Sequence, residues 1–160
     1  MLKDWGLALM VGVGVFFAVQ WSSSPVSTGM APDFNLSSTE GGSLSLSEFK
    51  GQTVILNFWG SWCGPCRAEI PEFAQWHKEH PETTMIGIAV RSGQAATVAQ
   101  KAKSLGINYP VVLADDKVLS DYNVSVFPTT IVVNPEGKIV SVSMGTIGGE
   151  TLSASVAKAE

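Results

Sequence analysis

Two cysteines, Cys63 and Cys66, are the only ones in the chain, and two residues separate them. A bridge between residues so close together removes little entropy from the unfolded chain. A disulfide-stapled domain would also need more cysteines, spread along the sequence. Stabilisation is therefore a poor reason for the pair, and thiol–disulfide exchange is the better one. In that chemistry one thiolate attacks a target disulfide, and the second thiol resolves the mixed disulfide that forms.

The surroundings of the pair predict a different role for each cysteine. Residues 53–58 (TVILNF) form an apolar, β-rich run that is typical of a strand buried on both faces, and a helix is expected from about Gly64 to His80. Cys63 then lies at the helix N-terminus, where free N–H groups and the macrodipole favour a thiolate. Cys66 follows one turn later, close enough to bond Cys63. We expect Cys63 to attack and Cys66 to resolve.

Glu69 is the acidic residue nearest to the pair along the predicted helix. It stands three residues after Cys66, so the two side chains share one part of the helix surface. Its carboxylate could accept the Cys66 proton when that thiol attacks. It could equally be an ordinary acidic residue near a helix start, where the dipole favours negative charge. The sequence leaves both interpretations open.

Half of a metal site is the main alternative for a Cys-x-x-Cys pair. Zinc usually takes four ligands, yet the only histidines, His77 and His80, come late in the predicted helix. We expect His77 to pack in the core and His80 to lie at the helix end. The sequence therefore predicts no metal, and no cofactor beyond a redox-active Cys63–Cys66 disulfide.

The composition narrows the class of protein. The chain has 160 residues, of which 45% are hydrophobic, and its net charge is -4. This length fits one domain with an appendage. The Lys and Arg residues are scattered and form no basic patch, so nucleic acid is not an expected partner.

Trp5 to Trp21 is a run of seventeen residues without a charged side chain. A helix of that length spans roughly 25 Å, at the short end for a bilayer. The two Trp residues fall where interfacial aromatics belong. Lys3 precedes the run, and no further Lys or Arg occurs before Lys50. We expect residues 5–21 to cross a membrane once, with the N-terminus in the cytoplasm and the remainder outside.

A cleaved signal peptide has a similar charged start and apolar middle. No clean A-x-A site follows the run, which favours an uncleaved anchor. A buried core helix would show a polar face, and this run offers only Gln20. We therefore divide the chain into an anchor or signal peptide (1–24), a short flexible linker (25–31) and a folded domain (32–160). The expected location is the cell membrane, with the redox domain facing the periplasm or another extracytoplasmic space.

The folded domain begins with a predicted hairpin and then alternates strands with helices. A turn at residues 40–42 (EGG) and a loose alternation of Leu44, Leu46 and Phe49 indicate the hairpin. Beyond residues 53–58, strands are expected at 84–90, 110–113, 129–133 and 138–144, and helices at 64–80, 94–105, 117–122 and 150–158. This order predicts an α/β sandwich around a mixed sheet.

Three segments give the domain a family resemblance. Residues 57–71 (NFWGSWCGPCRAEIP) resemble the active-site segment of TlpA/ResA-type thioredoxins. Residues 31–34 and 44–51 resemble the N-terminal hairpin of that family, and Tyr122 with residues 127–130 (FPTT) resembles its cis-proline segment. The resemblance covers residues 31–158. It implies a thioredoxin-like fold in which helices flank a mixed central sheet and an N-terminal β-hairpin precedes it.

The same resemblance implies a docking site for the substrate. It makes Phe127–Pro128 a cis peptide bond that faces the cysteines, with neighbouring backbone groups pairing with a substrate strand. It also identifies Glu69 with an active-site acid. Asn57 stands where cytoplasmic thioredoxins have a buried Asp, which shifts the acid–base role toward Glu69. The expected docking residues are Trp62, Gly64, Pro65, Phe127, Pro128 and Thr129.

The expected function is an extracytoplasmic thiol-disulfide oxidoreductase that reduces client disulfides and is itself kept reduced by a membrane electron donor. Gly64-Pro65 is the dipeptide of thioredoxin, whose low potential favours reduction. Apocytochrome c is one candidate client, which would place the protein in cytochrome c maturation.

Two other functions share parts of this pattern. A Sco-type copper assembly protein would have a wider cysteine spacing and a distant His, but no His follows His80. A peroxiredoxin-like peroxidase would have Thr-x-x-Cys, but residues 60–62 (GSW) precede Cys63.

Overall fold

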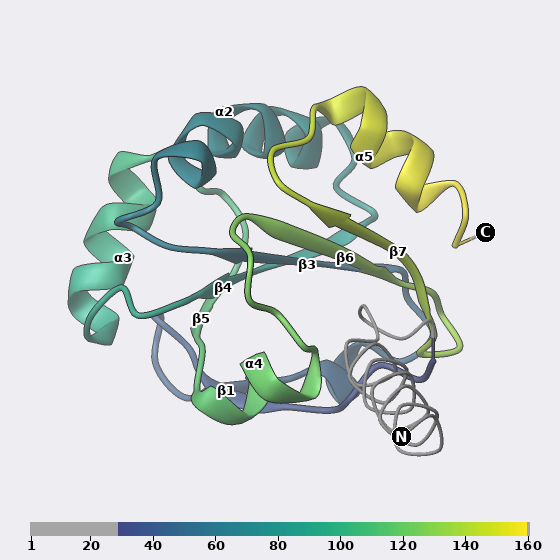
Figure 1. Ribbon diagram of the computed structural model, residues 1–160, viewed down its shortest axis with the longest axis horizontal. Helices are drawn as coiled ribbons and strands as arrows, with labels where there is room; N and C mark the ends of the chain where they lie inside the picture. Colours follow the sequence, from purple (N-terminus) through teal and green to yellow (C-terminus); the bar gives the residue numbers. More distant parts are fainter. Residues whose placement is uncertain (1–28, 160) are drawn as a thin grey trace, which may run out of the picture.

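A five-stranded mixed sheet forms the centre of the computed structural model, which describes residues 29–159 (Figure 1). The central strand β3 (Val54–Trp59) runs parallel to β4 (Thr84–Ala89), and β5 (Val111–Leu113) extends that side. On the other side, β6 (Thr129–Val133) and the edge strand β7 (Ile139–Met144) are each antiparallel to their neighbour. The mixed sheet predicted from the sequence is confirmed.

The helices form layers on both faces of this sheet. Figure 1 shows α2 (Gly64–Glu79), α3 (Ala95–Ser104) and α5 (Gly149–Val156) along one face, with α4 (Asp116–Asp121) across the other. All six residues of β3 are buried, and their side chains alternate between the two layers. Leu56 packs on the α4 side, whereas Ile55 packs on the α2 side. A strand buried on both faces explains the continuous apolar run in the sequence.

The N-terminal hairpin is shorter than the alternating run predicted. Strands β1 (Asn35–Ser37) and β2 (Ser43–Ser45) pair antiparallel, but residues Leu46–Phe49 form a 3-10 helix, η1. The Glu48 carboxylate accepts a hydrogen bond from the Ser45 N–H at 2.8 Å, which favours the turn at that point. The predicted hairpin is confirmed, but only the first part of the run that indicated it is extended. The pair Ser45 and Glu48, which caps the 3-10 helix, lies within residues that also alternate as a strand would, so the sequence did not distinguish the two.

The other elements begin and end within two residues of their predicted bounds. One packing prediction fails: His77 is only half-buried, with its ring against Tyr109 at 5.7 Å between centroids, so it is not a core residue. His80 caps the end of α2 as expected.

The described chain begins against the edge strand β7. Ile139 donates its N–H to the Gly29 carbonyl at 2.9 Å, and Ala31 donates to Gly137 at 2.8 Å. The last residues of the predicted linker therefore belong to the fold. The predicted anchor lies outside the described residues. Among residues 29–159, no helix combines the length and the apolar character needed to cross a membrane.

Candidate active site

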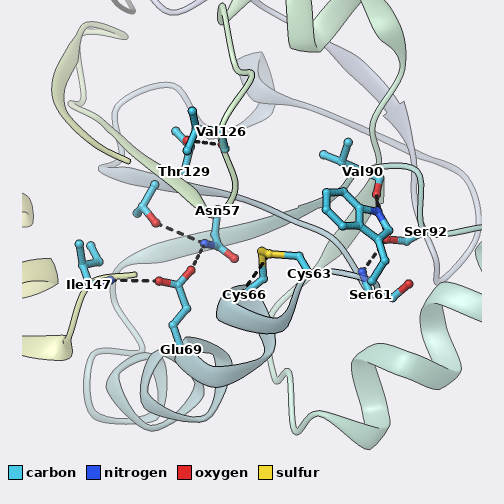
Figure 2. The surroundings of a disulfide bond; sticks show 12 residues. Asn57, Ser61, Cys63, Cys66, Glu69, Val90, Ser92, Val126, Thr129 and Ile147 are labelled. Atoms are coloured by element: carbon cyan, nitrogen blue, oxygen red, sulfur yellow. Dashed lines mark hydrogen bonds between the residues drawn. A yellow bond between two sulfur atoms is a disulfide. The ribbon is translucent and has the colours of Figure 1, made fainter. Parts of the chain in front are cut away.

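A disulfide joins Cys63 and Cys66 at the start of α2, the helix that follows β3 in the chain (Figure 2). The Cα atoms lie 5.3 Å apart. Cys63 is the N-cap residue, and its Sγ accepts a hydrogen bond from the Cys66 N–H at 3.2 Å. Because this N–H belongs to the free end of the helix, it stabilises a thiolate on Cys63 once the disulfide is reduced. The predicted position of Cys63 at the helix N-terminus is confirmed.

The two sulfur-bearing residues differ in access. Cys63 keeps 5% of its surface exposed, whereas Cys66 is completely buried beneath the helix. Both pack in an apolar cluster that includes Trp59 and Ile70. A partner can therefore approach Cys63 but has no surface to contact on Cys66.

Glu69 is buried on the same helix, with only 1% of its surface exposed. Its carboxylate accepts one hydrogen bond from the Asn57 amide at 3.0 Å and another from the Ile147 N–H at 3.2 Å. Burial raises the pKa of Glu69 from 4.5 to about 7, because desolvation outweighs these two hydrogen bonds, which act in the opposite direction. Glu69 is thus able to exchange a proton near neutral pH, unlike an acidic residue on the surface of a helix start.

Asn57 connects this acid to the sheet. Its Nδ2 donates to Glu69 and also to the Thr130 hydroxyl, at 3.2 Å, on the neighbouring strand β6. Its Oδ1 is buried and has no hydrogen-bond partner. The sequence indicated a missing Asp at this position but gave no sign of the contact with Thr130, which is 73 residues away.

Aromatic side chains border the site on its exposed side. Trp62 is 54% exposed, and its Nε1–H donates to the Val90 carbonyl at 3.0 Å. The Trp62 ring meets Phe127 edge-on, at 5.6 Å between centroids. The Phe127–Pro128 peptide bond is cis, as the resemblance implied. Val126, which the sequence analysis did not single out, is 47% exposed beside Phe127.

The six expected docking residues are not equally accessible. Gly64 and Pro65 are exposed like Trp62, and Phe127 is half-buried. The side chains of Pro128 and Thr129 are buried, and the Thr129 hydroxyl donates to the Val126 carbonyl at 2.7 Å. Pro128 has no N–H and its carbonyl accepts the Gly145 N–H at 2.8 Å, while Thr129 pairs with a strand on each side, so a substrate could pair only with the backbone before them, at Phe127.

No group of three or more His, Cys, Asp or Glu within residues 29–159 is placed to hold a metal ion. The chemistry of the described site therefore centres on one disulfide, one buried carboxyl group and the amide that contacts it.

Comparison with known proteins decides the family. The model of the AhpC/TSA family matches residues 28–142. The chain belongs to the AhpC/TSA family. This AhpC/TSA protein is 41% identical over 144 residues to the thiol-disulfide oxidoreductase ResA of Bacillus subtilis. The alignment covers 88% of the chain and 80% of ResA. It is 30% identical over 159 residues to the thioredoxin-like protein YneN of the same organism, and that alignment covers 92% of the chain and 93% of YneN.

A solved structure supports the same assignment. The thiol:disulfide interchange protein of the thioredoxin family from Chlorobium tepidum TLS superimposes with a TM-score of 0.74 at 30% identity, covering 85% of this chain and 99% of that one. The AhpC/TSA protein described here is accordingly a ResA-like thiol-disulfide oxidoreductase with a thioredoxin-like fold and a redox-active Cys63–Cys66 pair.

Proposed function

We propose that the protein reduces disulfides of client proteins outside the cytoplasm, with Cys63 attacking and Cys66 resolving. The observation that carries this assignment of roles is the asymmetry of the pair. Cys63 is the helix N-cap and keeps some exposure, whereas Cys66 is buried behind it. An incoming disulfide can meet only the Cys63 sulfur, and the helix N-terminus stabilises the thiolate needed for attack.

Glu69 serves the second half of the exchange. When Cys66 attacks the mixed disulfide, its thiol must lose a proton in a buried, apolar place. Glu69 lies one turn further along α2, is buried as well, and has a pKa of about 7. A carboxyl group with that pKa can accept the proton at neutral pH and return it in the reverse reaction.

The client docks on the exposed edge of the site around Trp62, here called the Trp62 rim. Trp62, Val126 and Phe127 offer apolar surface beside Cys63, and an extended client segment pairs with the backbone at Phe127, which lies before β6. A client of this kind is a partly unfolded chain whose cysteines are oxidised. Apocytochrome c fits that description, and its reduction would place the protein in cytochrome c maturation.

Residues 5–21 hold the domain at the membrane, and a membrane electron donor keeps the pair reduced. The apolar run and the absence of Lys and Arg between Lys3 and Lys50 support this orientation.

Cysteine variants test the proposed roles. We expect Cys63→Ser to abolish the reduction of insulin disulfides, because the attacking thiolate is lost. Cys66→Ser should instead accumulate a mixed disulfide on Cys63, visible as a reductant-sensitive adduct on a gel. Full insulin reduction by Cys63→Ser would refute the assignment.

The same trap identifies the client. Cys66→Ala, expressed in cells as the full chain, should retain covalently whatever Cys63 attacks, and mass spectrometry of the adducts names it. Recovery of c-type apocytochromes is the expected outcome. Adducts that consistently exclude them would contradict the proposed role in cytochrome c maturation while leaving the oxidoreductase chemistry intact.

A further inference from the structure

The amide oxygen of Asn57 is a buried polar atom with no role in the exchange steps assigned to Cys63, Cys66 and Glu69. Asn57 is completely buried in the middle of β3, and its Oδ1 has no hydrogen-bond partner. Buried acceptors are almost always satisfied, so an unpartnered one calls for a physical reason. Figure 2 shows this oxygen on the side of Asn57 that points toward the Cys63–Cys66 disulfide.

The orientation of the amide follows from its other neighbours. Nδ2 donates to the Glu69 carboxylate at 3.0 Å and to the Thr130 hydroxyl at 3.2 Å. Exchanging the two ends of the amide would place Oδ1 against an oxygen of the ionised Glu69 carboxylate and lose that bond, although the Thr130 hydroxyl could then donate to Oδ1. The amide nitrogen therefore faces Glu69, and the oxygen is left facing the disulfide, of which Cys66 is the completely buried member.

A disulfide has no hydrogen atom to offer this oxygen, whereas a thiol does. We propose that Asn57 is a positioning residue whose Oδ1 accepts a hydrogen bond from the Cys66 thiol whenever the Cys63–Cys66 bond is open. The proposal deepens the assigned exchange chemistry, and it is independent of the identity of the client.

Reduction of the disulfide proceeds through two thiol attacks. A thiolate of the reductant attacks the Cys63 Sγ, the Cys63–Cys66 bond breaks, and the Cys66 sulfur leaves with the electron pair. Cys66 then takes one proton and becomes a thiol. Attack by a second thiol of the reductant releases Cys63 as a thiolate and leaves the reductant as a disulfide. From the first cleavage onward, the Cys66 S–H is available to Asn57.

Two consequences follow for the reaction. Asn57 Oδ1 is satisfied in the open forms and unsatisfied in the disulfide form, so it shifts the equilibrium toward the dithiol. The same bond holds the Cys66 sulfur in place until its proton is removed. Ionisable neighbours of this position include Cys63 at the N-cap of α2, Glu69 within α2, and Tyr109 before β5, whose pKa is raised by burial and by the Glu69 charge.

An infrared measurement tests the bond directly. In the full chain carrying Cys63→Ala, Cys66 is the only cysteine, so its S–H stretching band is the only one from the protein. We expect this band at the lower frequency of a hydrogen-bonded thiol, moving to higher frequency when Asn57→Leu is added. The matched control is Thr130→Val, which removes a partner of Nδ2 and leaves Oδ1 in place, so the band should not move.

Two results would overturn the proposal. One is a band at the frequency of an unbonded thiol in the Cys63→Ala protein itself, which needs no substitution at Asn57. The other is a shifted band that Asn57→Leu leaves unchanged, which would assign the bond to another acceptor. Neither result bears on insulin reduction by the unmodified pair, so this test and that of the proposed function fail separately.

A redox titration supplies the second readout. In the chain with both cysteines, Asn57→Leu should shift the equilibrium with glutathione toward the disulfide by about threefold, as expected for a weak hydrogen bond. Thr130→Val should titrate like the parent protein. An unchanged equilibrium in folded Asn57→Leu would contradict a preference of Asn57 for the dithiol.

Discussion

At the scale of single residues, burial of Glu69 disfavours its charged form and thereby raises its pKa into the range useful for proton exchange. Its carboxylate accepts hydrogen bonds from the Asn57 amide and the Ile147 N–H, but these do not replace the water lost on burial. The pKa therefore rises from 4.5 to about 7. Between these two values the folded protein holds a proton that the unfolded chain has released. The free energy of unfolding must then fall as pH rises through this window, and above about pH 7 the contribution is lost.

Replacement of Glu69 by Gln removes this titration. We expect the parent protein to lose up to about 3 kcal/mol of unfolding free energy between pH 5 and pH 8 through this group, since one pKa unit corresponds to about 1.4 kcal/mol. Glu69→Gln should lack that component. Urea unfolding of both proteins at the two pH values measures it. Glu79→Gln, an exposed position on the same helix, is the control and should keep the decline. Equal pH dependence in the Glu69→Gln and parent proteins would contradict the raised pKa.

At the scale of elements, β4 approaches two rings at Gly87. A Cβ atom there would lie 3.1 Å from the Trp59 Nε1 and 3.2 Å from the Tyr109 Cε2. Both rings are buried, so neither can move aside easily. Because Gly87 has no side chain, the Trp59 and Tyr109 rings can pack directly against β4. Gly87 lies opposite Asn57 on the neighbouring strand.

An added methyl group tests this packing. Gly87→Ala should lower the free energy of unfolding by about 1–2 kcal/mol, as overpacking in a rigid core does. Gly64→Ala is the matched control, because a Cβ there meets nothing within 4 Å. It should be neutral or slightly stabilising, since Ala is the better helix former. Denaturant unfolding compares the two variants, and equal stability would show that the rings can give way.

At the scale of the whole molecule, the disulfide and the start of the described chain lie at opposite ends of the sheet. Cys63 comes four residues after Trp59, the last residue of β3. Gly29 instead contacts β7 at Ile139, which pairs with Val133 at the other end. Val133 is also opposite Val54, the first residue of β3. A six-residue strand separates the two ends by roughly 15–20 Å. A membrane on the Gly29 side would leave the Trp62 rim facing away from it.

Labelling of intact cells tests this orientation. After mild reduction, a membrane-impermeant maleimide should modify Cys63 in intact cells as fully as in lysed cells, because the proposed site faces the extracytoplasmic space. Cys63→Ser should stay largely unlabelled, since Cys66 is buried. A cytoplasmic thiol protein in the same cells is the control for leakage. Labelling of Cys63 only after lysis would reverse the proposed topology.

The sequence by itself determined the features that depend on neighbours along the chain. The cysteine spacing, the buried run before it and the helical pattern after it placed Cys63 at a helix N-terminus, and strand–helix alternation predicted the mixed sheet. It did not distinguish the 3-10 helix at residues 46–49 from extended chain, because a local hydrogen bond between Ser45 and Glu48 was hidden in an alternating pattern.

Only the tertiary structure decided the state of Glu69 and the place of Asn57. Residues far away in the chain enclose Glu69, with Ile147 78 positions distant, and their combined desolvation sets its pKa. The contact between Trp62 and Phe127 likewise joins two separate segments. How deeply a side chain is buried, and which groups it bonds, depends on all the residues packed around it. The spacing of residues along the chain does not determine either property. The same Glu could have been a solvated acid at a helix start, and the fold made it a buried carboxyl group with a raised pKa.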